Sequence, residues 1–148
     1  HERGVMGDVC SPGGVQAAGR VWRTMEDDTM SMRSVGARLV AKCNAGENFE
    51  VMRTMYDPGI VSVESGGEET TGQAAVIKKS ERWAAGNTIH GSTVRGPYFN
   101  GPDEFSVMFS FEVTPTATGK RVTKEEVAVY TVKEDKITRE RFFNAGEW

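Results

Sequence analysis

The sequence predicts an α+β domain in which helices pack on the concave face of a curved antiparallel sheet. The 148 residues include 17 valines and seven phenylalanines but a single leucine, Leu39, and β-branched and aromatic side chains favour strands. Helical patterns come first along the chain and strand patterns follow, which is typical of the α+β class. From Phe105 to Val113 a large apolar side chain recurs at every second position, as in a strand with one buried face.

Three helices are predicted at about residues 34–44, 48–56 and 70–85. Each follows an apolar stripe, and the stripes end at Asn-Ala-Gly, Asp-Pro-Gly and Gly-Asn segments. Asn48 is a potential N-cap of the second helix. One strand, residues 60–64, is expected between the second and third helices, followed by a Gly- and Glu-rich loop at 65–69. The later strands are expected at residues 88–95, 105–114, 122–133 and 136–143.

The chain is long enough for one domain. Glycines and a proline interrupt residues 1–30, which have no sustained hydrophobic period, so we expect a tail or upstream extension there, with one short helix near 15–25. Residues 31–148 are expected to form the folded domain. Turn residues separate its elements, but no internal repeat divides it.

Composition narrows the classes of partner. The net charge is −3 and the pI is about 5.5, whereas nucleic-acid binders carry a basic surface, so no nucleic-acid partner is expected. No apolar run reaches the roughly 18 residues of a membrane span, so no membrane partner is expected either. Cys10 and Cys43 are too few for a disulfide framework, which predicts a reducing and therefore cytoplasmic location.

Several short motifs resemble those of the SnoaL-like branch of the nuclear transport factor 2-like superfamily, which includes ketosteroid isomerase-type folds. The likeness covers about residues 35–143, and the matching motifs are Asn44-Ala45-Gly46-Glu47, Tyr56-Asp57, Gly72, Tyr130-Thr131-Val132 and Lys136-Ile137. The resemblance implies a cone-shaped sheet that wraps the three helices around an apolar cavity, and a homodimer formed through the outer sheet face. The superfamily contains isomerases, cyclases, hydrolases, dehydratases and non-catalytic binders, so the fold does not fix the function.

The ketosteroid isomerase mechanism is not expected. Glu64 lies near the position of that enzyme's general base, but Leu39 and Ala128 occupy the positions of its two oxyanion donors. Each missing donor would cost about 3–4 kcal/mol of transition-state stabilisation.

Glu64 and His90 are the candidate catalytic residues. A carboxyl group at the end of an apolar strand and an imidazole that titrates near neutrality could share a proton across a cavity. The alternative is structural, with Glu64 a solvated strand end and His90 hydrogen-bonded to the neighbouring helix end.

The candidate ligand-binding residues are aromatic or hydrogen-bonding side chains, each of which could instead belong to the core: Trp83, Tyr98, Phe105, Phe109, Glu126 and Tyr130. Glu126 has a second alternative, an ion pair with Arg121 or Arg139. Val127 and Val129 are expected on the buried side of their strand. With one usable histidine and no cysteine cluster, neither a metal nor a cofactor is expected.

These observations favour a small-molecule pocket protein that resembles SnoaL-like acid–base enzymes of the isomerase, cyclase or hydrolase type. Its expected ligand is a hydrophobic molecule that carries a carbonyl group. The alternative is a non-catalytic dimeric ligand-binding or protein-docking domain. The faces to which Glu64 and His90 point distinguish the two hypotheses.

Overall fold

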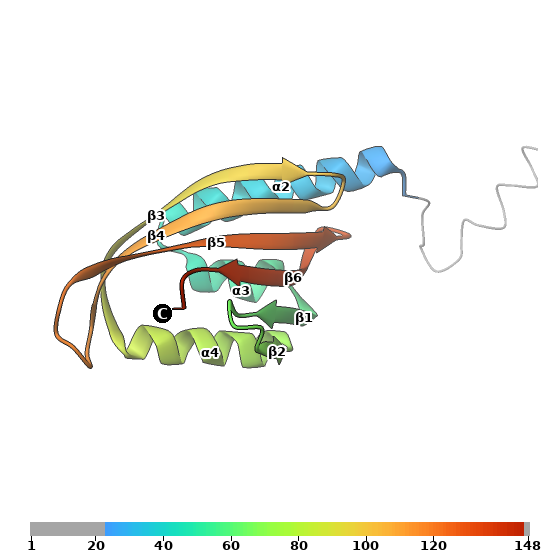
Figure 1. The fold of residues 1–148 in the computed structure, drawn as a ribbon. Coiled ribbons are helices and arrows are strands. Elements are labelled where there is room, and N and C mark those ends of the chain that lie inside the picture. Colours follow the sequence, from blue (N-terminus) through green and yellow to red (C-terminus); the bar gives the residue numbers. More distant parts are fainter. Residues whose placement is uncertain (1–22, 147–148) are drawn as a thin grey trace, which may run out of the picture.

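The computed structural model describes residues 23–146 and confirms the α+β class (Figure 1). The elements are α2 (Met25–Asn44), α3 (Asn48–Met55), β1 (Tyr56–Val63), β2 (Glu69–Thr71), α4 (Gln73–Ala85), β3 (Asn87–Asn100), β4 (Glu104–Pro115), β5 (Val122–Lys133) and β6 (Lys136–Phe143). Most of the expected tail, with the short helix near 15–25, lies outside the described residues. The first described helix already begins at Met25.

The six strands form one open sheet in the order β2-β1-β6-β5-β4-β3. Strands β3 to β6 form the expected antiparallel meander, and β2 pairs antiparallel with β1. Strand β1, however, lies parallel to β6. The sheet is therefore mixed, which corrects the antiparallel prediction. The reason is that the chain passes from β1 through β2, α4 and the strands β3 to β5 before β6 returns beside β1 in the same direction.

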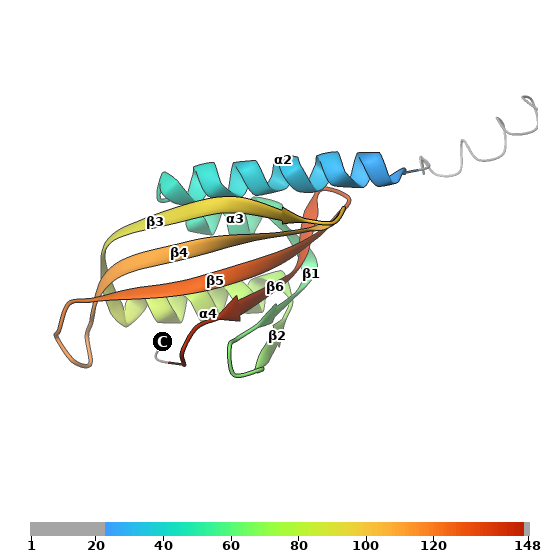
Figure 2. The same ribbon diagram turned by 45° about the horizontal axis from the view of Figure 1, so that its top comes forward.

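The curved sheet bends around the helices, as the resemblance implied (Figures 1 and 2). Helix α2 packs against β3, β4 and β5, whereas α4 contacts β1, β2 and β3. The capping box of Thr24 and Asp27 begins α2, because each side chain accepts a hydrogen bond from the backbone N–H of the other residue. Helix α3 begins at Asn48 as expected, but Asn48 is not its cap, since Glu47 precedes the helix without a side-chain hydrogen bond.

The core lies between α2 and the concave side of the sheet. The alternation predicted for β4 is confirmed, since Phe105, Val107, Phe109 and Val113 are buried. On α2 the buried apolar residues repeat at helical spacing: Met32, Val35, Leu39 and Cys43. This stripe faces the inner side chains of the sheet, so one hydrophobic surface holds helix and strands together.

On β5 the buried face is the opposite of the one expected. Ala128 and Tyr130 are buried, whereas Val127 and Val129 are half-buried on the outer side. The cause is the register with β4, which pairs Ala128 with the buried Val107 and Tyr130 with the buried Phe105. Side chains that are paired across neighbouring strands share a face, so the partner strand decides which face of β5 is inside.

Gly36 allows α2 to approach the sheet closely. A Cβ atom there would lie 3.2 Å from Cβ of Pro97 and 3.3 Å from Cγ of Phe105. We expect Gly36→Val to lower the free energy of unfolding by about 2 kcal/mol, because the added methyl groups overpack this contact. Ala37→Val, at the exposed neighbouring position, is the control and should cost only about 0.5 kcal/mol. Urea denaturation measures both variants. Equal losses of unfolding free energy in Gly36→Val and Ala37→Val would show that α2 does not pack tightly on the sheet at Gly36.

Candidate functional site

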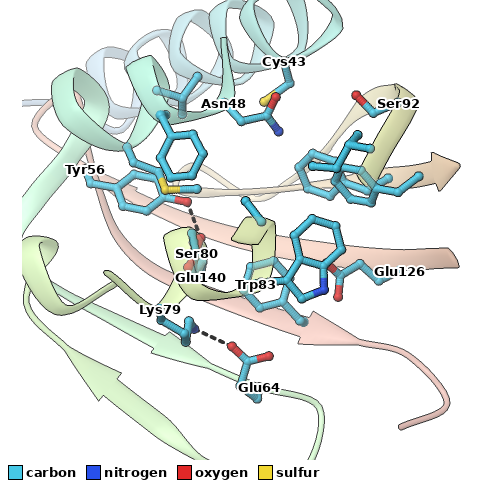
Figure 3. Close-up of a pocket in the computed structure, with 18 of the residues that line it drawn as sticks. Cys43, Asn48, Tyr56, Glu64, Lys79, Ser80, Trp83, Ser92, Glu126 and Glu140 are labelled. Carbon is cyan, nitrogen blue, oxygen red and sulfur yellow. Dashed lines mark hydrogen bonds and ion pairs between the residues drawn. The ribbon is translucent and has the colours of Figure 1, made fainter. Parts of the chain in front are cut away.

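A cavity of about 510 Å³ opens between α3, α4 and the inner face of the sheet (Figure 3). Its wall is mostly apolar and aromatic, and the residues that line it include Phe49, Met52, Trp83, Phe109, Phe111 and Phe142. The Trp83 ring packs edge-to-face on Phe111, which stacks on Phe109, with centroid distances of 5.5 and 5.6 Å. A pocket of this size with a few polar groups is typical of small-molecule sites.

Glu140 of β6 contributes a buried carboxyl group to the wall and is 2% exposed. The Tyr56 hydroxyl donates a hydrogen bond to its Oε1, and the Ser62 hydroxyl donates to its Oε2 over 2.7 Å. Burial raises the pKa of the Glu140 carboxyl, and the hydrogen bonds from Tyr56 and Ser62 oppose that rise. Because β1 and β6 are neighbours in the sheet, residues from both strands meet at this carboxyl.

Lys79 of α4 extends this cluster toward the rim of the cavity. Its Nζ donates to the Ser62 hydroxyl oxygen over 2.7 Å and forms an ion pair with Glu64. The Lys79 and Glu64 side chains are 22% and 35% exposed, so the ion pair is more accessible to water than Glu140 is. Tyr56, Glu140, Ser62, Lys79 and Glu64 thus form one hydrogen-bonded array, which we call the polar array.

Glu126 of β5 is a separate carboxyl group on the cavity wall (Figure 3). Its Oε2 accepts a hydrogen bond of 3.0 Å from the Asn144 amide. Burial raises the pKa of Glu126 to about 7, and the nearby Glu64 and Glu140 carboxyls contribute to the rise. Near neutral pH this carboxyl is therefore present in both its protonated and its ionised form.

The structure does not bring His90 to Glu64. His90 is exposed, and its Nε2 lies 2.7 Å from the Thr114 hydroxyl oxygen. The pairing of β3 with β4 skips His90, since Ile89 pairs with Val113 and Gly91 with Glu112. This bulge turns the imidazole away from the cavity, whose wall includes Ile89 but not His90. The acid–base hypothesis as built on Glu64 and His90 is therefore wrong, because the two side chains do not share a cavity and the partner of Glu64 is Lys79. Any proton transfer in the cavity has to rest on another group of its wall.

The other sequence candidates divide into two groups. Trp83, Phe109, Glu126 and Tyr130 line the cavity, so their placement agrees with the expected roles, which remain predictions. The remaining two do not line it. Tyr98 is 57% exposed, and Phe105 is fully buried in the core, where its ring stacks on Tyr130 at 5.1 Å.

The ion pair suggested for Glu126 is not formed with either arginine. Arg121 pairs with Glu112 and Arg139 with Glu69, on the exposed surface. The side chains of Arg139 and Arg141 are exposed.

Sequence reasoning missed Tyr56, Ser62, Lys79 and Glu140 as site residues. One signal was available for Glu140, which lies between the two exposed arginines on β6 and two residues before Phe142. In a strand, alternate residues share a face, so solvated arginines on one side place Glu140 and Phe142 on the inner side.

Two negative findings concern the described part of the chain. Within residues 23–146, no three His, Cys, Asp or Glu side chains are grouped so that they could hold a metal ion. No helix in the same range has the length and hydrophobicity that crossing a membrane requires.

Comparisons with solved structures identify similar folds. A protein from Mesorhizobium loti, provisionally described as a SnoaL-like polyketide cyclase and carbohydrate phosphatase, is 38% identical, with a TM-score of 0.71, and the match covers 75% of this chain and 97% of that one. A provisional SnoaL-like polyketide cyclase from Jannaschia is 16% identical, with a TM-score of 0.65 and coverage of 85% and 92%. AclR from Streptomyces galilaeus, a provisional hydroxylase, is 14% identical, with a TM-score of 0.61 and coverage of 80% and 92%.

No curated protein sequence matches this chain significantly. The family model that describes the SnoaL-like domain matches residues 30–144, which is most of the sequence. The Mesorhizobium loti protein, matched over nearly its whole length, gives the same assignment. The chain belongs to the SnoaL-like domain family.

Proposed function

We propose that this protein is an acid–base enzyme whose cavity binds a hydrophobic molecule with a carbonyl group, and that Glu126 transfers a proton on the carbon next to that carbonyl. One observation carries the proposal: the Glu126 carboxyl lines an apolar cavity of about 510 Å³, and its pKa is about 7. The provisional description of the Mesorhizobium loti protein as a polyketide cyclase supports a ligand of this chemical class.

Glu126 has the properties of a general base near neutral pH. A catalytic pKa close to the working pH gives both a useful fraction of carboxylate and a sufficient drive to accept a proton. The Asn144 amide donates to one carboxyl oxygen and holds the group in place, so the second oxygen is available to a ligand. The same carboxyl can return the proton to another carbon, which gives isomerisation. In an aldol-type ring closure the enolate carbon instead bonds to a second carbonyl carbon, and the carboxyl returns the proton to the alkoxide oxygen that forms.

The charges of the wall favour a neutral ligand. Four carboxyl groups line the cavity, those of Glu64, Glu68, Glu126 and Glu140. Of the described residues on the wall, Lys79 alone is cationic, and Glu64 already pairs with it. An anionic ligand would meet like charges in a poorly solvated space, whereas a neutral ketone would not. Aromatic side chains around it would contact its apolar body.

The test uses 2-tetralone, a bicyclic ketone, dissolved in D₂O with the purified protein. The ¹H NMR signals of the hydrogens next to the carbonyl should decay faster with the wild type than in buffer. The catalysed rate should rise as the pH increases through about 7, because the base must be ionised to accept a proton. Glu126→Gln should lower the catalysed rate by about 100-fold or more.

Glu125→Gln is the matched control, because Glu125 is the exposed neighbour on the same strand. It should leave the exchange rate unchanged. Equal rates for the wild type and Glu126→Gln would rule out Glu126 as the base. Binding of 2-tetralone without any catalysed exchange would instead favour the non-catalytic ligand-binding alternative. The homodimer remains a prediction, and sedimentation velocity of the purified protein tests it.

A further inference from the structure

The polar array has a fixed direction of hydrogen bonding. The Lys79 ammonium can only donate, so the Ser62 hydroxyl must accept from it over 2.7 Å and point its own hydrogen at Glu140 Oε2. The Oε2 atom therefore already receives a hydrogen. The Oε1 atom faces the Tyr56 hydroxyl.

The protonation state of Glu140 therefore determines the direction in which the Tyr56 hydroxyl hydrogen points. When Glu140 is ionised, both oxygens are acceptors and Tyr56 donates to Oε1. When Glu140 is protonated, Ser62 occupies Oε2, so the acid hydrogen resides on Oε1 and is donated to the Tyr56 oxygen. The Tyr56 hydrogen is then released from Glu140, and Tyr56 lines the cavity (Figure 3).

We propose that Tyr56 donates a hydrogen bond to the carbonyl oxygen of the ligand, and that Glu140 is the positioning residue whose proton turns the Tyr56 hydroxyl toward the cavity. This inference rests on the proposed function, because it names the group that binds the ligand oxygen while Glu126 acts on the neighbouring carbon. Tyr56, Glu126 and Glu140 all line the same cavity, so one ligand in it can meet both the donor and the base.

The groups that face Glu140 come from three elements. Strand β1 supplies Tyr56, Ser62 and Glu64, helix α4 supplies Lys79, and β5 supplies Glu126 and Tyr130. Burial and the Glu64 charge favour the protonated acid, whereas the Lys79 charge and the two hydrogen bonds favour the carboxylate. A protonated Glu140, and with it a donor available to the ligand, is therefore favoured as the pH falls.

The test compares two ligands of the same shape, 2-tetralone and its hydrocarbon analogue tetralin. Affinities are measured by calorimetry in a Glu126→Gln background, so that titration of Glu126 does not contribute. This parent protein should prefer the ketone by about tenfold, the value of one buried hydrogen bond. The preference should decline as the pH rises. Adding Tyr56→Phe should abolish it, whereas adding Tyr98→Phe, at an exposed tyrosine away from the cavity, should not.

Glu140→Gln separates a positioning role from a merely structural one. The glutamine amide donates permanently to the Tyr56 oxygen, as the protonated acid does, and its carbonyl still accepts from Ser62. The ketone preference should therefore persist in this variant and become independent of pH. Retention of the preference in Tyr56→Phe, or its loss in Glu140→Gln, would overturn the inference alone. A wild type that binds neither compound would overturn the proposed function and this inference together.

Discussion

Glu126→Gln is expected to raise the free energy of unfolding by about 3 kcal/mol at about pH 8. In the folded protein the pKa of Glu126 is about 7, against 4.5 as its ordinary value. The ionised carboxyl is therefore less stable in the fold than in the unfolded chain. The contribution of Glu126 to the free energy of unfolding is therefore fully present below about pH 4.5. It decreases as the pH rises through 7 and is constant at higher pH. Glutamine removes the loss and still accepts from Asn144.

Urea denaturation at about pH 4 and about pH 8 measures the effect. At the lower pH the variant and the wild type should have similar stability, because Glu126 is protonated in both states. Glu125→Gln should change little at either pH, since Glu125 is exposed. A variant as stable as the wild type at the higher pH would show that Glu126 is better solvated than its position on the cavity wall indicates. If Glu126→Gln is more stable than the wild type but inactive in deuterium exchange, the Glu126 carboxyl lowers the stability of the fold while it supports activity. That trade-off is common for catalytic residues.

Phe105→Ala is expected to lower the free energy of unfolding by about 4 kcal/mol. Phe105 is fully buried, stacks on Tyr130, and lies under Gly36, where α2 approaches the sheet. Truncation to alanine leaves a void between a helix and a strand, both of which are held in place by other contacts, so the void cannot readily close.

Phe99→Ala is the control for this prediction. Phe99 is 40% exposed, and the Arg33 guanidinium lies 4.5 Å from its ring centroid. Its loss should cost about 1 kcal/mol. Chemical denaturation of both variants at neutral pH provides the measurement. Similar losses for the two would contradict the assignment of Phe105 to the core.

The sequence predicts much of the fold because the dominant patterns are local. The period of two in β4 and the stripe on α2 each follow from side chains a few residues apart, and both are confirmed. The parallel pairing of β1 with β6 could not be predicted in the same way, because it depends on two segments at opposite ends of the domain. The inner face of β5 is predicted wrongly for a related reason. Val127 and Val129 alternate along the strand with Glu126, Ala128 and Tyr130. Only the register with β4 shows which of these two sets faces inward.

The site was less predictable than the fold. Glu126, Trp83 and Tyr130 were recognised as pocket candidates, and all three line the cavity. The sequence prediction places His90 wrongly because a single extra residue in β3 reverses the face of its side chain. The adjacent Gly91 is the one local sign of this bulge, since glycine inside a strand often marks one. Lys79 was overlooked although it lies three residues after the buried Val76 and four before Trp83, which is the spacing of one helix face.

The polar array joins strands that the ribosome makes at very different times. Ser62 and Glu140 are 78 residues apart, and their hydrogen bond crosses the parallel pair β1 and β6. A nascent chain that has completed α2 to α4 and β1 to β5 still lacks Glu140, so this carboxylate cannot yet receive the Tyr56 hydrogen. The cavity wall and the polar array are therefore completed by the same event, the pairing of β6 with β1 and β5.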